Sequence, residues 1–256
     1  MPASSAASPA TPPLCVADDG TFWPWVSWPR FAAWPAKEST VVVVPLVGLA
    51  DWGLGHPLDA EEAVLLPILK RACEQLPPGT RALVVPPLRF VVGPDAGSAF
   101  AVDPPTAHAL IAEVAACIAA AGFRKVVLLN ASPWNEELCG AAARDLRVGR
   151  GLHMFQIHLS ALGLDFHPVR SRSRRTLQTL LTHLGGRPPE PAEAAAGAVP
   201  AAWGDETVRS LAGPAATGEE AAREGAATLT AASARLAKLL SDIRDRAALT
   251  ASLPWA

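Results

Sequence analysis

Side chains that hold metal ions are scarce in this chain of 256 residues, which has six histidines, four cysteines and no tyrosine. No apolar run approaches the ~18 residues that a membrane-spanning helix needs. Basic and acidic residues number 22 and 24, for a formal net charge of −2, so the chain lacks the positive charge typical of a nucleic-acid binder. We therefore expect neither a nucleic acid nor a membrane as a partner.

The four cysteines, Cys15, Cys73, Cys117 and Cys139, are widely spaced. No two of them have the C-x-x-C spacing of a metal clip or a redox motif. Cys73 and Cys117 fall on stretches that read as apolar helix faces, so we predict buried free thiols. The sequence shows no signal-peptide pattern, which favours the reducing cytoplasm as the location.

The N-terminal segment is rich in proline, alanine and serine, and residues 1–13 contain no hydrophobic stretch. We predict a disordered tail over residues 1–20, followed by one domain over residues 21–250. Tryptophans crowd the start of this domain, at Trp23, Trp25, Trp28 and Trp34. Such a cluster favours packing in the core or at a subunit interface over ligand binding.

Strand and helix patterns alternate along the domain. Short apolar runs predict buried parallel strands over residues 41–47, 81–86, 125–130 and 152–157. Apolar residues at helical spacing predict helices over residues 58–76, 106–121, 135–147 and from Thr217 onward. The core face of the helix over 106–121 is expected to hold Leu110, Ile111, Val114, Cys117 and Ile118. Because strands separated by helices need right-handed crossovers, we predict a single-domain three-layer α/β/α sandwich with a mostly parallel central sheet.

Ligands of such sheets bind beyond the carboxyl ends of the strands, so the loops after the strands are where chemistry is expected. The loop after the first strand holds Asp51, His56, Asp59, Glu61 and Glu62. The loop after the third strand runs from Asn130 to Asn135. We expect these loops to meet at one edge of the sheet. Their predicted pocket residues are Asp51, Trp52, His56, Asp59, Asn130, Ser132, Trp134 and Asn135.

The order of these features resembles the creatininase (creatinine amidohydrolase) family. Members of that family follow the first strand with Gly-Ser-Thr-Glu-Gln-His-Gly-Pro-His-Leu-Pro-Leu, where this chain has Gly48-Leu-Ala-Asp-Trp-Gly-Leu-Gly-His-Pro-Leu58. The family's third strand ends in Asn-Gly-His, and this one ends in Asn130-Ala-Ser132. The family's closing Ala-Thr-x-x-x-Gly helix resembles the segment that begins at Ala216. The likeness covers roughly residues 38–246 and implies a creatininase-like fold that forms closed oligomers.

The resemblance also implies a centre of two zinc or manganese ions, which clamp an attacking hydroxide and polarise an amide carbonyl. Each ligand position departs from the family pattern. The family's first-loop Glu falls on Ala50, or on Asp51 if one gap is allowed, and its first-loop His falls on Trp52. Its Asp falls on Glu61, and the His after the third strand falls on Ser132.

Two interpretations of these loops stay open. Asp51, His56 and Glu61 offer two carboxylates and an imidazole for a relocated metal site. Acids at a helix start are also favoured by the helix dipole alone, which would account for Asp59 and Glu61 without a metal. The candidate catalytic residues are Glu61 and Ser132, although no G-x-S-x-G motif surrounds this serine.

The downstream acids of the family pattern are replaced by an arginine run that includes Arg172, Arg174 and Arg175. Such a run could hold an anionic ligand, but it is also typical of a solvated helix face.

These replacements favour a creatininase-like protein with a degenerate metal site and no metal cofactor. Its pocket would bind a small polar molecule or serve the assembly of a homo-oligomer. The alternative is an active metal-dependent amidohydrolase, with relocated zinc or manganese, that cleaves a C–N amide bond of a small cyclic or linear amide.

Overall fold

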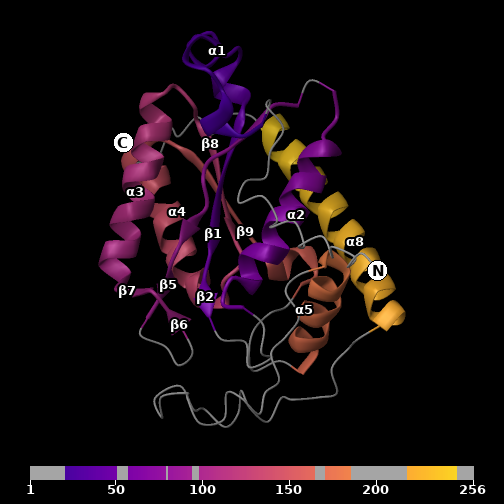
Figure 1. The fold of residues 1–256 in the computed structure, drawn as a ribbon. Coiled ribbons are helices and arrows are strands. Elements are labelled where there is room, and N and C mark those ends of the chain that lie inside the picture. Colours follow the sequence, from indigo (N-terminus) through magenta and orange to yellow (C-terminus); the bar gives the residue numbers. More distant parts are fainter. Residues whose placement is uncertain are drawn as a thin grey trace, which may run out of the picture.

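A parallel sheet forms the centre of the molecule (Figure 1). The computed structural model describes residues 21–50, 57–78, 80–93, 98–164, 171–185 and 218–246, so the predicted tail over residues 1–20, Cys15 and the loop over residues 51–56 lie outside the described residues. The main sheet has the order β3 (Ala82–Val84), β1 (Val41–Val47), β8 (Lys125–Asn130) and β9 (His153–His158), and β4 (Leu88–Arg89) also pairs with β1. Every pair in this sheet is parallel.

Short strands continue from the carboxyl edge of this sheet. Immediately after β1, β2 (Leu49–Ala50) pairs antiparallel with β6 (Ser98–Ala99). Following β4, β5 (Val91–Val92) pairs in parallel with β7 (Ala101–Val102). These four strands gather at the lower end of the sheet in Figure 1.

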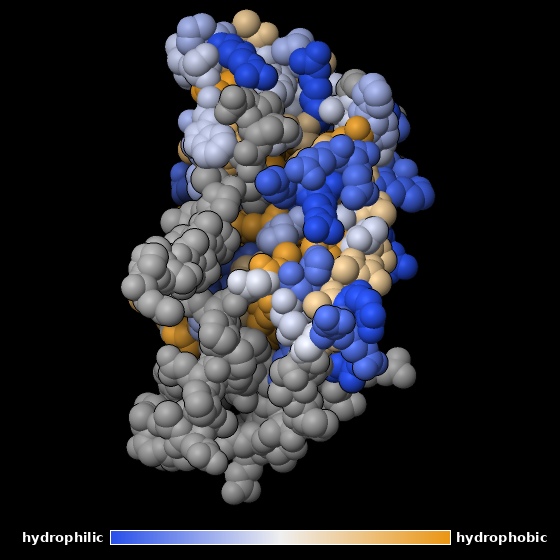
Figure 2. All heavy atoms as spheres, turned by 45° about the vertical axis from the view of Figure 1, so that its right-hand side comes forward, coloured by the Kyte–Doolittle hydropathy of each residue, from blue (hydrophilic) through white to orange (hydrophobic). Residues whose placement is uncertain are grey.

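Helices cover both faces of the sheet, which confirms the predicted three-layer sandwich (Figure 1). One layer holds α2 (Ala60–Glu74), α5 (Ser171–Leu184) and α8 (Gly218–Asp245), and the other holds α3 (Pro104–Ala120) and α4 (Glu136–Arg150). Figure 2 turns the α8 side forward and shows hydrophilic side chains over much of it, with apolar side chains between them. Short helical segments complete the described elements: η1 (Trp23–Trp25), α1 (Trp28–Ala32), η2 (Lys37–Ser39), η3 (Pro133–Asn135) and η4 (Leu159–Leu162).

The central strands are hydrophobic throughout because both of their faces are covered. Val41, Val43 and Val47 of β1 pack in the cluster on the α2–α8 side. Their neighbours Val42 and Val44 pack in the cluster on the α3–α4 side. This period-2 alternation fixes the register, because a slip of one residue would exchange the two cores.

The predicted core face of α3 is wrong in part. Ala107, Ile111, Ala115 and Ile118 are buried, whereas Cys117 and Leu110 are exposed. Helical periodicity could not locate the inner face because α3 is apolar almost all round. The prediction of a buried thiol is therefore wrong for Cys117, and Cys73 is half-buried. Cys139 is buried, and burial raises the pKa of its thiol to about 12.

The close packing of α5 against α8 depends on a glycine, Gly225, which has no side chain. A Cβ added at Gly225 of α8 would lie 2.0 Å from the Thr179 carbonyl oxygen of α5. Arg175 and Glu224 form an exposed ion pair across the same two helices, with Nη2 and Oε2 2.6 Å apart. Arg175 therefore belongs to an exposed helix surface, and the structure does not describe the side chains of Arg172 and Arg174.

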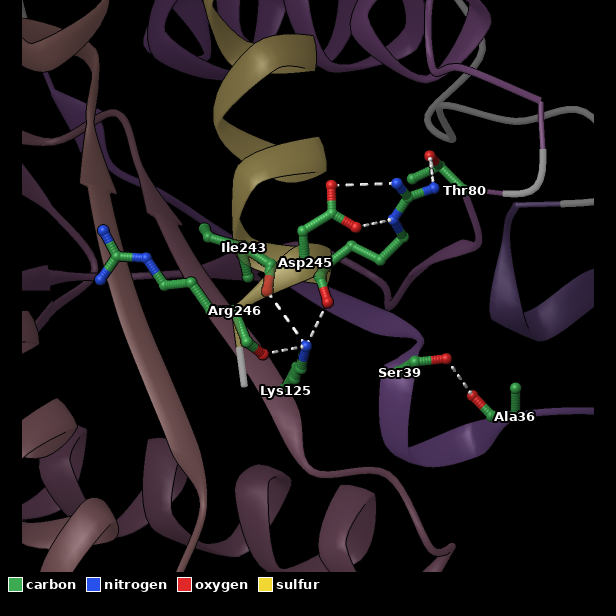
Figure 3. Close-up of polar contacts among 8 residues, drawn as sticks. Ala36, Ser39, Thr80, Lys125, Ile243, Asp245 and Arg246 are labelled. Atoms are coloured by element: carbon green, nitrogen blue, oxygen red, sulfur yellow. Dashed lines mark hydrogen bonds and ion pairs between the residues drawn. The ribbon is translucent and has the colours of Figure 1, made fainter. Parts of the chain in front are cut away.

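The end of α8 is tied to the start of β8 by Lys125 (Figure 3). Its Nζ donates to the carbonyl oxygens of Ile243 at 3.2 Å and Arg246 at 2.7 Å, and also to that of Arg244. Carbonyl groups in the last turn of a helix have no partner within the helix. The Lys125 ammonium supplies that partner, and burial lowers its pKa.

The tryptophan cluster divides into packed and exposed members. Trp23 packs against Phe31 and Phe123, with ring centroids 4.8 Å and 5.2 Å apart. Trp25 and Trp28 are 48% and 75% exposed. Core packing therefore accounts for Trp23, and a role of the exposed pair in an interface stays a prediction.

None of the helices in the described residues has both the length and the apolar character needed to cross a bilayer.

Candidate functional site

The centre of the candidate site is the end of β1, where a buried carboxyl meets the backbone. The Gly48 N–H donates to Glu61 Oε2 at 2.6 Å. A Cβ added at Gly48 would lie 2.7 Å from Val91 Cγ2, 2.9 Å from Glu61 Oε2 and 3.0 Å from Ser132 Oγ. Only glycine leaves room for these three side chains, so β1, α2, β5 and the loop after β8 converge on this point.

Glu61 is fully buried, and burial raises the pKa of its carboxyl to about 7 against the lowering effect of the Gly48 hydrogen bond. The nearby Ser132 hydroxyl also lowers the pKa of this carboxyl. Among the described residues, neither Glu61 Oε1 nor Ser132 Oγ has a hydrogen-bond partner that meets the distance and angle limits of a hydrogen bond. A buried polar atom without a partner requires an explanation such as an ion, a water or a ligand.

The loop after β8 is held by Asn130, which is buried. Its side-chain amide donates to the Ser132 carbonyl at 2.7 Å, and its Oδ1 accepts from the Ser132 N–H at 3.2 Å. The same amide lies 3.2 Å from Nδ1 of His158, the residue that pairs with Asn130 in the sheet. Asn130 therefore fixes the backbone that carries Ser132, and burial lowers the pKa of His158.

A second side-chain amide, that of Asn135, joins the loop after β8 to the segment around β5. Asn135 Nδ2 donates to the Phe90 carbonyl at 2.9 Å, and its Oδ1 accepts from the Val92 N–H at 2.9 Å. Phe90 and Val92 flank Val91 in the chain, so the two hydrogen bonds from Asn135 hold Val91 in place beside Gly48. Asn135 was predicted as a pocket residue, and the structure gives its buried amide two backbone partners.

The start of α2 carries two buried acids rather than a solvated acidic face. Asp59 is exposed at the N-cap, whereas Glu61 and Glu62 in the first turn are buried. The helix dipole alone does not explain such burial. Glu62 forms a forked ion pair with Arg89, whose Nε and Nη2 each lie 2.6 Å from a carboxylate oxygen.

The structure places Glu61, Ser132, Asn130 and Asn135 at the same end of the sheet. Trp134 is half-buried against the core cluster on the α2–α8 side. Asp51, Trp52 and His56 lie outside the described residues. Sequence reasoning missed Arg89 and His158, because the partners of both are distant along the chain.

The described residues do not fit a centre of two metal ions. They offer one carboxyl with an unpartnered oxygen and one serine hydroxyl, whereas zinc and manganese take imidazoles and several carboxylates. In the described part of the chain, no group of three or more His, Cys, Asp or Glu side chains is arranged to hold a metal ion.

Comparison with known proteins gives the family. The sequence model of the creatininase family, described as creatinine amidohydrolase, matches residues 25–183. The chain belongs to the creatininase family. No sequence match to a curated protein was found.

Solved creatininase structures share the fold. A protein from Bacteroides fragilis NCTC 9343, provisionally described as a creatinine amidohydrolase, has a TM-score of 0.60 at 14% identity, over 90% of this chain and 99% of that one. A manganese form of creatininase has a TM-score of 0.65 at 17% identity, over 89% and 100%. A mutant creatininase of the Zn-Zn type has a TM-score of 0.63 at 17% identity, over 88% and 98%. At these identities the likeness establishes the fold, and the chemistry of the site has to be argued from its residues.

Proposed function

We propose that this creatininase-family protein has lost the two-metal hydrolase centre and binds a small polar molecule at the carboxyl ends of β1 and β8. The observation that carries the proposal is the pair of unpartnered polar atoms, Glu61 Oε1 and Ser132 Oγ, buried where the strands end. A carboxyl and a hydroxyl together can accept from an N–H group and donate to an oxygen. Such a pair suits a polar ligand better than a divalent cation.

Loss of the metal pair is supported by the residue types at the family's ligand positions. A hydroxyl stands at Ser132 where the family resemblance places an imidazole, and Asn130 holds that loop in place by hydrogen bonds instead. Replacing metal ligands usually removes the activity while the fold persists. We also propose that the protein acts in the cytoplasm as a homo-oligomer.

A relocated metal site is the competing proposal. Glu61 Oε1 is free to serve as a ligand, and it would act with Asp51 and His56 in a metal-dependent amidohydrolase.

The two proposals predict opposite results for the full chain incubated with small cyclic and linear amides, creatinine included. Binding alone predicts a raised Tm with at least one compound and no hydrolysis, with or without added zinc or manganese. Ser132→Ala should weaken that rise in Tm, because it removes one of the two unpartnered groups. Hydrolysis that depends on metal and is lost in His56→Ala would contradict the proposal and support the amidohydrolase.

A further inference from the structure

Arg89 stands beside the candidate site on the neighbouring strand. In the parallel pair of β1 and β4, Arg89 lies opposite Val47, the residue before Gly48. Phe90, the residue after Arg89, donates its N–H to the Val47 carbonyl at 3.0 Å. Arg89 and Gly48, the residue that binds the Glu61 carboxyl, therefore lie at the same end of β1, the edge at which parallel sheets bind their ligands.

The Arg89 guanidinium is held in one orientation by Glu62. Both hydrogen bonds of the fork are 2.6 Å long, and the side chains of Arg89 and Glu62 are 38% and 8% exposed. The fork uses Nε and Nη2 of Arg89, so the two N–H groups of Nη1 are not part of it. The buried Glu62 carboxylate thus holds the partly exposed Arg89 guanidinium in place. Binding sites use such supporting hydrogen bonds to orient a charged side chain toward its ligand.

This pair differs from the other forked arginine pairs in the described part of the chain. Arg175 and Glu224 are both well exposed, at 59% and 39%, and they join two helices away from the ends of the strands. Arg244 pairs with its neighbour Asp245, which is 62% exposed. An exposed pair contributes little to stability. Of the forked pairs among the described residues, only Glu62–Arg89 combines a buried carboxylate with a place at the candidate site.

We infer that the small-molecule site takes a zwitterion, with Arg89 as the contact for its carboxylate and Glu61 with Ser132 as the contact for its N–H group. This inference rests on the proposed function, because it names the ligand class of the same site. A planar guanidinium recognises a planar carboxylate by parallel hydrogen bonds. At the other end, an ammonium or similar N–H group would donate to the unpartnered Glu61 Oε1.

The test measures binding to the full chain by calorimetry. The probes are the ω-amino acids from 3-aminopropanoate to 6-aminohexanoate, each beside its primary amide, which lacks the carboxylate. We expect at least one acid to bind ~10-fold or more tightly than its amide, since a charged hydrogen-bonded contact contributes more than ~1.4 kcal/mol.

Three variants assign that difference to Arg89. Arg89→Lys keeps the charge but loses the fork, and the double variant Glu62→Gln with Arg89→Gln removes both charges without leaving a buried acid unpaired. Both should reduce the preference for the acid, and the double variant should abolish it. Arg175→Gln breaks the fork between α5 and α8, away from the candidate site, and should leave the preference unchanged.

Equal binding of acid and amide, or an unchanged preference in the double variant, would overturn the zwitterion assignment while leaving the proposed small-molecule site in place. If none of these probes binds and no polar compound raises the Tm, both the assignment and the proposed function fail.

Discussion

Gly48 and Glu61 form a direct contact between the end of β1 and the first turn of α2, with the Gly48 N–H 2.6 Å from Glu61 Oε2. The contact keeps a fully buried carboxyl at the point where a parallel sheet presents its ligands. In the part of the chain that the structure describes, neither the other oxygen of Glu61 nor the neighbouring Ser132 hydroxyl has a hydrogen-bond partner. A binding site built on these groups should respond to pH and to small changes at Glu61.

The first prediction concerns the pH dependence of stability. The pKa of Glu61 is raised from 4.5 to about 7 in the folded chain, so the folded state holds a proton that the unfolded state loses. The free energy of unfolding should therefore be highest below pH 4.5 with respect to this group. The free energy of unfolding should fall by up to about 3 kcal/mol as the pH rises toward 7, and it should then level off.

Glu61→Gln removes this titration while keeping a similar side-chain shape. Urea unfolding of both proteins between pH 5 and 8 measures the difference, and the variant should gain stability relative to the natural protein as pH rises. A constant difference across this range would show that Glu61 does not titrate there.

The second prediction concerns the α5–α8 contact. Gly225→Ala should destabilise the protein by more than about 2 kcal/mol, because its Cβ would collide with the Thr179 carbonyl at 2.0 Å. Gly149→Ala in α4 is the matched control, because nothing lies within 4 Å of its added Cβ. This control should be neutral or stabilising by up to about 1 kcal/mol. Equal midpoints of thermal unfolding for the two variants would contradict the close helix packing.

The third prediction concerns the end of α8. Lys125→Met should cost about 1–3 kcal/mol, because it leaves carbonyl groups of Ile243 and Arg246 without their donor. Lys238→Met removes an exposed pair with Asp242 and should change stability by less than about 0.5 kcal/mol. Hydrogen exchange at the end of α8 provides a local readout. Unchanged protection there in Lys125→Met would contradict the anchoring role.

The fourth prediction concerns the proposed homo-oligomer. Trp25 and Trp28 expose large aromatic surfaces, and such residues are enriched at interfaces. The double variant Trp25→Ala with Trp28→Ala should reduce the mass measured by light scattering. Leu110→Ala, which removes an exposed apolar side chain from α3, serves as the control and should leave the mass unchanged. An unchanged mass in the tryptophan variant would exclude these residues from the interface.

The fold was predictable because its strongest patterns are local. The valines of β1 form a continuous apolar run, which predicts a buried parallel strand, and the structure buries every residue of that strand. The face of α3 that packs against the sheet was less predictable, because a helix that is apolar almost all round gives no contrast between its faces. Cys117 consequently lies outside, although its spacing suggested the core.

The sequence indicated where the loops of the candidate site meet, but not the contacts between their side chains. Because the ends of adjacent parallel strands meet, the loops after them were expected to converge at one edge, and Glu61 and Ser132 lie there beside Gly48. The pairing of Glu62 with Arg89 spans 27 positions of the sequence, and no local pattern indicates it. The burial of both acids of α2 likewise depends on tertiary packing, so the helix dipole was a sufficient explanation until the fold was known.

The most direct test of the loss of the metal pair is the metal content of the full chain purified without chelator. Mass spectrometry should find far less than one zinc or manganese ion per chain, and a chelator should leave the Tm unchanged, because no folding energy would come from a metal. One or two ions per chain, lost in Asp51→Ala or His56→Ala together with a fall in Tm, would contradict the account.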